Sequence, residues 1–371
     1  SEDGLCPLCS KIQKLSNNVL YSDFFSVVLE GEADGLPLPG GYLLLADDEK
    51  TLSKRMEKDS YFVRVYAKNQ MYTGKHIATK LWVGDYTTGD TFEKFAQKAE
   101  GIKRIGVLRA DVDNLGQTFV AGFAGKYATL SRTAALSRQL SIFFKYYIRS
   151  ILKNGEYHID GEKKLTERNA TIVYSGGDDV FIVGAWNEVI ELSIDLQEKF
   201  KKYTQGTLSI SSGIGIYECT YPIGAIANET EAESKRMPEK DSVTLMDDGE
   251  THLINELEIC DGTYRWEELY KSVLGEKYDV IQDFLGESDE RGMSFLYRML
   301  ELIRNQKEKI NFARFVYLLS RLEPDKEGEK KEKYRKFSRK MYQWVQSEKD
   351  CRELKTAINL YAYMHREKGA H

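Results

Sequence analysis

Two adjacent acids, Asp178 and Asp179, lie in the segment of this 371-residue chain that is best suited to chemistry. They follow Gly176 and Gly177, and apolar β-forming residues flank the four on both sides. Because glycine tolerates positive φ, the pattern predicts two strands joined by a tight hairpin whose tip presents both carboxylates. Asp and Gly also dominate ordinary turns, so the four residues alone do not distinguish a metal site from a plain turn.

A second acidic segment could complete such a metal site. The apolar run 104–110 predicts a buried strand, which is followed by Asp111 and Asp113. Acids at the end of one strand and on a neighbouring hairpin suit two-metal phosphoryl transfer, in which carboxylates and substrate phosphates bind Mg²⁺ or Mn²⁺. We expect Asp111, Asp178 and Asp179 to be catalytic metal ligands, whereas Asp113 either adds a ligand or caps the turn.

The elements that must position these acids form an α+β pattern. The predicted order is strand, helix, strand, strand, helix, strand, helix, which suits a ferredoxin-like antiparallel sheet with helices on one face. The expected ranges are 104–110, 129–152, 170–175, 180–184, 187–203, 207–217 and 222–236. The charged segment 154–169 between the first helix and the hairpin predicts a solvated linker. After residue 264, apolar residues at three-to-four spacing predict helices.

These patterns divide the chain into four regions. We expect a partial zinc-binding segment at 1–19, a small mainly β lead-in at 20–98, the metal-binding domain at 99–255 and a helical domain at 256–371. The content of 42% hydrophobic and 30% charged residues is typical of a soluble protein. No stretch approaches the ~20 apolar residues of a membrane helix. We therefore expect a cytoplasmic protein without a membrane partner.

A Cys-x-x-Cys pair, Cys6 and Cys9, begins the chain, which has five cysteines in all. Five scattered cysteines are too few for a disulfide framework. The pair provides half of a tetrahedral Zn²⁺ site, because zinc takes four ligands. An incidental pair or a redox site remains open, since the sequence shows no further ligand.

The stretch 101–245 resembles the nucleotide-cyclase palm of diguanylate-cyclase type domains. It is more closely similar to the large polymerase-cyclase subunit of type III-A (Csm) CRISPR effector complexes. The matching motifs are LRADVDNLG (108–116), LSRQLSIFFKYY (136–147), YSGGDDVF (174–181) and LSISSGIG (208–215). The resemblance implies a nucleotidyltransferase that makes cyclic oligoadenylate from ATP. It also implies the other Csm subunits, guide crRNA and target RNA as partners.

The resemblance also indicates which residues contact the nucleotide. Lys235 and Lys240 match basic residues that hold triphosphate in such palms, and Ser137 and Ser141, four apart on one helix face, could reach the adenine edge. The expected nucleotide-binding residues are Ser137, Ser141, Ser175, Gly176, Gly177, Lys235 and Lys240. A solvated helix face remains the alternative for the lysines, and ordinary helix packing for the serines.

Two other functions stay open. A diguanylate-cyclase-like enzyme would consume GTP, but such enzymes typically recognise guanine through an Asn eight residues beyond the first metal Asp, where this chain has Phe119. A non-catalytic scaffold would bind nucleotide or RNA without turnover, and the intact acids argue against it.

The family's arrangement raises an expectation about the extent of the chain. A second Cys-x-x-Cys and another palm lie upstream in the family, so we expect a fragment that begins inside a zinc-binding region. The family's DNA-cutting domain uses an adjacent His-Asp pair, which this sequence lacks, so nuclease activity is not predicted. The net charge of −5 argues against global nucleic-acid binding, whereas the basic run 326–340 is either a solvated face or a contact with RNA or a subunit.

Overall fold

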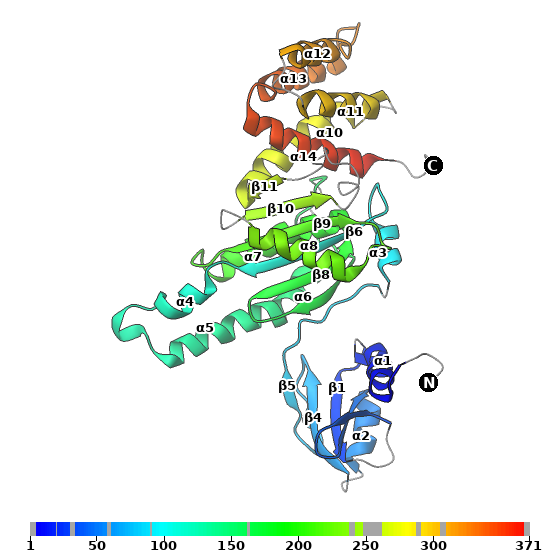
Figure 1. Ribbon diagram of the computed structural model, residues 1–371, viewed down its shortest axis with the longest axis vertical. Helices are drawn as coiled ribbons and strands as arrows, with labels where there is room; N and C mark the ends of the chain where they lie inside the picture. Colours follow the sequence, from blue (N-terminus) through cyan, green and yellow to red (C-terminus); the bar gives the residue numbers. More distant parts are fainter. Residues whose placement is uncertain are drawn as a thin grey trace.

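The protein has three regions that follow one another along its long axis: a small N-terminal sheet, a larger central sheet and C-terminal helices (Figure 1). The computed structural model describes residues 5–19, 21–29, 34–57, 61–89, 91–161, 164–236, 242–247, 262–286, 291–304 and 309–366. Across these ranges, no helix is long and apolar enough to cross a membrane.

The N-terminal region is a five-stranded sheet of order β2-β3-β1-β4-β5. Its elements are α1 (Pro7–Val19), β1 (Phe24–Leu29), β2 (Leu36–Leu38), β3 (Tyr42–Asp47), α2 (Glu49–Glu57), β4 (Phe62–Lys68) and β5 (Thr79–Leu81). Phe24, Leu52 and Val65 belong to a separate small core between the sheet and α2. The mainly β lead-in is confirmed, and its last strand, β5, ends at Leu81.

The central sheet has six strands in the order β11-β10-β9-β6-β8-β7. The strands are β6 (Ile105–Val112), β7 (Ala170–Ser175), β8 (Asp179–Ala185), β9 (Ile210–Tyr217), β10 (Ser242–Asp247) and β11 (Gly262–Arg265). The neighbours among β9, β6, β8 and β7 are all antiparallel, so these four form the predicted ferredoxin-like palm. Two further strands extend it, since β10 pairs parallel to β9 and β11 antiparallel to β10.

Helices cover both faces of the palm sheet, so the expectation of helices on one face is wrong. They are α3 (Phe92–Lys98), α4 (Leu115–Ala121), α5 (Leu130–Ile142), the π-helical η2 (Phe143–Tyr147), α6 (Ile148–Lys153), α7 (Trp186–Tyr203) and α8 (Ile223–Arg236), with a 3-10 turn η1 (Gly125–Tyr127). Strand β6 explains the difference, because it is apolar on both sides. Val107 packs with Phe95 of α3 and Ile226 of α8, whereas Leu108 joins the core beneath α5 and α7.

The C-terminal helices share one core with the palm. They are α9 (Trp266–Glu268), the π-helical η3 (Leu269–Tyr278), α10 (Asp279–Leu285), α11 (Arg291–Arg304), α12 (Lys309–Ser320), α13 (Glu329–Trp344) and α14 (Glu348–His365). Trp266 Nε1 donates to the Ile210 carbonyl of β9 (2.8 Å), and Ile102 N donates to the Tyr363 carbonyl of α14 (2.9 Å). The predicted helical domain is confirmed, although β11 lies in its expected range and extends the palm sheet.

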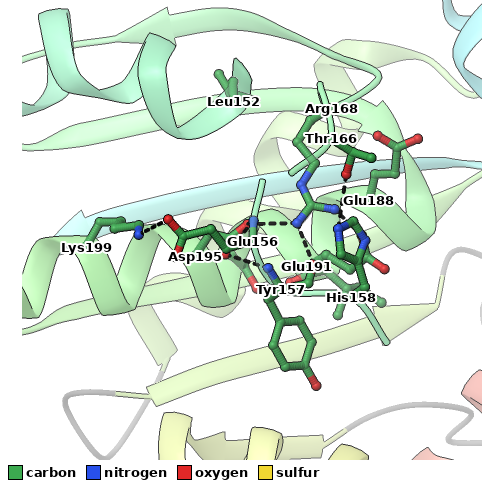
Figure 2. A network of polar contacts seen from close by, with 12 residues as sticks. Leu152, Glu156, Tyr157, His158, Thr166, Arg168, Glu188, Glu191, Asp195 and Lys199 are labelled. Atoms are coloured by element: carbon green, nitrogen blue, oxygen red, sulfur yellow. Dashed lines mark hydrogen bonds and ion pairs between the residues drawn. The ribbon is translucent and has the colours of Figure 1, made fainter. Parts of the chain in front are cut away.

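The segment 154–169 contains a buried ion-pair network, so the expectation of a solvated linker is wrong (Figure 2). The Arg168 side chain is 1% exposed. It contacts the carboxylate of Glu191, donates to Asp195 Oδ2 (2.7 Å) and donates to the Tyr157 carbonyl (2.5 Å). Burial raises the pKa of Glu191 to about 7. The network joins the start of β7 to α7, and so fixes one arm of the acidic hairpin against the palm core.

Candidate metal and nucleotide site

The end of β6 and the start of β8 place two of the candidate metal ligands side by side. Asp111 pairs with Asp179 across the antiparallel ladder. Directly opposite residues have Cβ atoms about 4.5–5.5 Å apart, with side chains on the same face of the sheet. Asp178 lies in the turn just before, and its carbonyl accepts a hydrogen bond from Val112 N (3.2 Å). The structure therefore brings all three acids to one end of the palm sheet.

The three carboxylates repel one another. The pKa of Asp111 is raised, first by burial and then by the charges of Asp178 and Asp179. Burial and the charge of Asp179 likewise raise the pKa of Asp178. Crowded carboxylates favour the protonated form, and a bound divalent cation would reverse that preference. This electrostatic arrangement suits a cation site.

The number of carboxylates also suits a metal ion whose remaining ligands come from the substrate. Within the described ranges, no three His, Cys, Asp or Glu side chains are already placed to hold an ion. Mg²⁺ commonly takes only one or two carboxylates and completes its octahedral shell with water and substrate phosphates. Asp111 and Asp179, paired in the ladder, supply that number. The acids fit Mg²⁺ or Mn²⁺ bound together with a nucleotide, and their role as ligands remains a prediction.

The hairpin turn uses its glycines for space rather than for left-handed backbone. Neither Gly176 nor Gly177 has positive φ, so that expectation is wrong. Gly176 N donates to the Asp179 carbonyl (2.9 Å), which closes the turn. A Cβ atom on Gly176 would lie 2.1 Å from the Tyr174 hydroxyl, whereas one on Gly177 would meet only Ser141 Oγ, at 3.8 Å. Gly177 therefore leaves open space beside the acids.

Tyr174 is a residue of this site that the sequence reasoning did not single out. Its hydroxyl hydrogen-bonds the Asp179 side chain, and the charge of Asp179 raises the Tyr174 pKa. The side chain is otherwise exposed. A hydrogen bond from Tyr174 restricts the orientation of the Asp179 carboxylate. The sequence carried one signal, a polar-tipped aromatic five residues before Asp179 in the strand that pairs with it.

Asp113 is buried and bound to β9. Its two carboxylate oxygens accept hydrogen bonds from Ser209 Oγ (2.7 Å) and Ser211 Oγ (2.8 Å), and its own N–H donates to the Ser209 carbonyl (2.9 Å). Of the two roles left open by the sequence, these contacts favour the structural one. Asp113 anchors the end of β6 to β9 two residues beyond Asp111, so it fixes the position of Asp111.

The expected nucleotide-binding residues lie in different environments. Ser141 on α5 lies beside the hairpin turn, and Ser137 is exposed one helical turn earlier. The hydroxyl of Ser175 donates to the Phe144 carbonyl, so it ties β7 to η2. Lys235 lies near the end of α8, but its side chain falls outside the described residues, and so does Lys240.

The cysteine pair lies at the start of α1, far along the chain from the acids. Both thiols are exposed, and Cys9 N lies 3.3 Å from Cys6 Sγ. This hydrogen bond lowers the pKa of Cys6, which favours the thiolate that binds metal. Among the described residues no group of three potential ligands includes them, so Zn²⁺ here remains a prediction.

Several basic residues of the run 326–340 form ion pairs with acids of the same helical domain. Lys331 lies 3.0 Å from Glu327, Lys336 lies 3.2 Å from Asp283, and Lys340 lies 2.6 Å from Glu276. These pairs favour the solvated-face interpretation of the run over a nucleic-acid contact.

Comparison with known proteins places the palm and the helical domain in described families. Residues 104–244 match "Cas10/Cmr2, second palm domain", and residues 282–367 match "CRISPR RNA silencing complex Cmr2 subunit, second helical domain". The first match covers the two strands and the hairpin turn that carry the three acids. The second covers most of the C-terminal helices.

Relatives match nearly the whole chain. A "CRISPR system single-strand-specific deoxyribonuclease Cas10/Csm1 (subtype III-A)" of Mycobacterium tuberculosis is 40% identical over 99% of this chain and 45% of its own length. The chain thus spans about half the length of the curated relatives it matches. A Csm1-Csm4 cassette in complex with cA4 has a TM-score of 0.65 at 20% identity, covering 92% of this chain and 48% of that chain. The cassette in complex with one ATP has a TM-score of 0.64 at 23% identity, covering 94% and 50%. At this identity, the two structures show the shared fold.

Proposed function

The chain belongs to the Cas10/Csm1 family of subtype III-A CRISPR systems, and from that membership we propose that it carries a nucleotidyltransferase palm of the effector complex. The proposed reaction converts ATP to cyclic oligoadenylate. The observation that carries the proposal is the pairing of Asp111 with Asp179, beside Asp178, at the end of a palm sheet. The ATP and cA4 bound in related cassettes support an adenine nucleotide as substrate.

The proposed chemistry is the attack of a ribose hydroxyl on the α-phosphate of a second ATP, with release of pyrophosphate. Asp111 and Asp179, supported by Asp178, would hold Mg²⁺ or Mn²⁺, which when bound acidifies the attacking hydroxyl and neutralises charge on the leaving phosphates. Tyr174 orients the Asp179 carboxylate. Gly177 leaves room for the nucleotide at the turn, where Ser141 is the nearest side chain. In such reactions, positioning and charge supply most of the catalysis.

Joining two nucleotides requires a donor pocket and an acceptor pocket. The described residues provide one acidic hairpin, so we propose that a second palm contributes the other pocket. The proposed partners are the other Csm subunits, with Csm4 among them because related cassettes pair Csm1 with Csm4, together with guide crRNA and target RNA. On this proposal, chain 1–371 alone binds ATP weakly and forms little product.

Guanine nucleotides fit this chain less well. Phe119, which stands where diguanylate cyclases typically carry Asn, packs against the palm core. It offers no side-chain hydrogen bond to a base edge. The relatives are named as single-strand-specific deoxyribonucleases, and our proposal assigns no nuclease chemistry to the residues of this chain.

The test measures products by mass spectrometry in the assembled effector complex with target RNA, supplied with Mg²⁺ and either ATP or GTP. We expect cyclic oligoadenylate from ATP, and its loss in Asp179→Asn. The control variant is Asp325→Asn, which changes an exposed acid in the helical domain. Unchanged synthesis in Asp179→Asn would refute the metal role, and guanine-containing products would favour the diguanylate-cyclase alternative.

A further inference from the structure

A continuous row of aromatic side chains crosses the surface from the segment after β5 to α7. Its members are Trp82, Tyr146, Tyr147 and Tyr203, and successive ring centroids lie 4.6, 5.3 and 5.5 Å apart. Trp82 is 36% exposed, Tyr146 48% and Tyr147 44%. Exposed aromatic residues are common singly, but a connected row of large rings indicates a binding surface. We call these four residues the aromatic row.

A pocket opens at the Tyr203 end of the aromatic row. Its volume is about 300 Å³, and its lining includes Phe143, Tyr147, Ile151, Tyr203, Lys199 and Lys202. This size lies at the lower end of the range for small-ligand sites, about 300–1,000 Å³. Glu156 lines the pocket as well and pairs with Lys199, so Lys202 carries the positive charge of the site, and the aromatic rings suit a flat group such as a nucleobase.

Positive charge occurs at several points beside the aromatic row, from Lys80 at Trp82 and Arg149 in α6 to Lys202 at the pocket. Lys80 Nζ lies 3.7 Å from the centroid of the Trp82 ring. Arg149 lies 3.7 Å from Asp85, whose carboxylate is already paired with Lys68 at 2.8 Å. The single negative charge of Asp85 therefore faces two positive side chains, and the local net charge is positive. This local charge contrasts with the net charge of −5 for the whole chain.

We propose that the aromatic row binds single-stranded RNA. Sequence-tolerant single-strand sites combine stacking rings with a basic track for the phosphates, and both features occur here. Aromatic rings alone would also suit a protein interface, but the lysines beside this row favour phosphate groups, because lysine is depleted at the centre of protein interfaces. Ser150 and Asn154 also line the pocket, and their polar groups suit the ribose 2′-hydroxyl that distinguishes RNA from DNA. The inference does not depend on nucleotidyl transfer.

The first test uses intrinsic fluorescence, because Trp82 is the exposed member of the four tryptophans. Trp186 is 0%, Trp266 3% and Trp344 3% exposed. We expect a 20-residue oligouridylate to quench tryptophan emission of the chain saturably, and Trp82→Phe to abolish the quenching. Oligouridylate avoids any affinity of the acidic site for adenine. Saturable binding without quenching would overturn the stacking role of Trp82, and absence of binding would overturn the proposal.

The second test measures the affinity of labelled oligouridylate by fluorescence anisotropy. Tyr146→Ala with Tyr147→Ala should raise Kd about fivefold or more, since each base–aromatic stack contributes measurably to affinity. Tyr317→Ala, at a 65% exposed aromatic in α12, is the control and should leave Kd unchanged. An equal rise in Kd in both variants would indicate nonspecific binding and overturn the assignment to this surface.

Two further measurements vary the charge of the protein and the sugar of the oligonucleotide. The double variant Lys80→Gln with Lys202→Gln should lower the slope of log K against log salt by roughly 0.7 for each phosphate that the protein no longer neutralises. The control, Lys326→Gln with Lys330→Gln, should leave that slope unchanged. Lys202, Lys326 and Lys330 are exposed and Lys80 is half-buried against the Trp82 ring, so these substitutions remove little packing and keep the proposal testable if the tyrosine variant fails to fold. Oligodeoxyuridylate should bind more weakly than the RNA. Equal affinity for DNA would overturn the choice of RNA, and an unaltered salt slope would favour a protein partner instead.

Discussion

Replacing Arg168 by Met should destabilise the palm domain strongly. The guanidinium is 1% exposed, and it faces Glu191 and Asp195, whose side chains are 7% and 2% exposed (Figure 2). Met is apolar and leaves Asp195 buried without its cation and Glu191 beside the His158 ring, which lies 3.4 Å from its carboxylate. Removing one partner of a buried ion pair typically costs about 3–5 kcal/mol, because the remaining charge stays uncompensated.

The loss of stability in Arg168→Met should also depend on pH. Burial already raises the pKa of Glu191 to about 7, and the neighbouring Arg168 charge holds it down. Without Arg168, the folded-state pKa rises further above the unfolded value. A carboxyl with a raised folded pKa destabilises the fold as pH increases through that interval. The variant should therefore lose more stability at pH 7.5 than at pH 5.5.

The assay is denaturant and thermal unfolding of wild type and variant at both pH values. At pH 7.5, we expect Tm to fall by roughly 10 °C. The control is Lys199→Met, because Lys199 pairs with Glu156 at the half-exposed edge of the same network and should contribute less than about 1 kcal/mol. A destabilisation below about 1 kcal/mol in Arg168→Met, or one independent of pH, would refute the reasoning.

Three further predictions concern the acids and their supports. Asp111→Asn should abolish product formation in the assembled complex yet raise Tm slightly, because it removes one of three repelling charges; a lowered Tm would contradict the repulsion. Tyr174→Phe should raise the Mg²⁺ concentration needed for half-maximal synthesis. Gly176→Ala should do the same, since its Cβ would lie 2.1 Å from the Tyr174 hydroxyl and 2.8 Å from Asp179 Oδ1 and would displace both. An unchanged Mg²⁺ titration in both variants would remove Tyr174 from the site. Asp113→Ala should cost about 1–3 kcal/mol in denaturant unfolding, because two serine hydroxyls lose their acceptor; no measurable destabilisation would argue against the anchoring role.

The palm strands could be predicted because their signals are local. The apolar run at 104–110 and the β-forming residues around the hairpin are recognisable without knowing their partners. In contrast, β10 was missed because it is held by pairing with β9, some 30 residues earlier in the chain. Its sequence alone is too short and too mixed to indicate a strand.

The charged segment 154–169 is where the sequence-based expectation and the structure differ most. The charges of 154–169 suggested solvent, yet Arg168 is buried because α7 presents two acids to it. A signal was present in α7, where Glu191 and Asp195 stand four apart among apolar residues on nearly every side. Charged residues at helical spacing within the buried part of a helix require a buried partner.

The acidic site was predicted in part. The convergence of Asp111 with the hairpin acids follows from strand order, which the motif spacing suggested. The role of Asp113 could not be decided, because it depends on which way one side chain turns at the end of β6. The contribution of Tyr174 depends on a side-chain contact across the turn, which no pattern of residue types specifies.

Strand β6 connects the C-terminal helices to the acidic site. Just before it, Ile102 is hydrogen-bonded to Tyr363 of α14, whereas the far end of the strand carries Asp111 and is followed by Asp113. The eight residues of β6 span roughly 26 Å at about 3.3 Å per residue. Because β6 is paired with β8 on one edge and with β9 on the other, its backbone is hydrogen-bonded along both edges. The strand that carries Asp111 therefore begins where the C-terminal helices are hydrogen-bonded to the palm, so a displacement of those helices at Tyr363 would act on the element that positions the carboxylates.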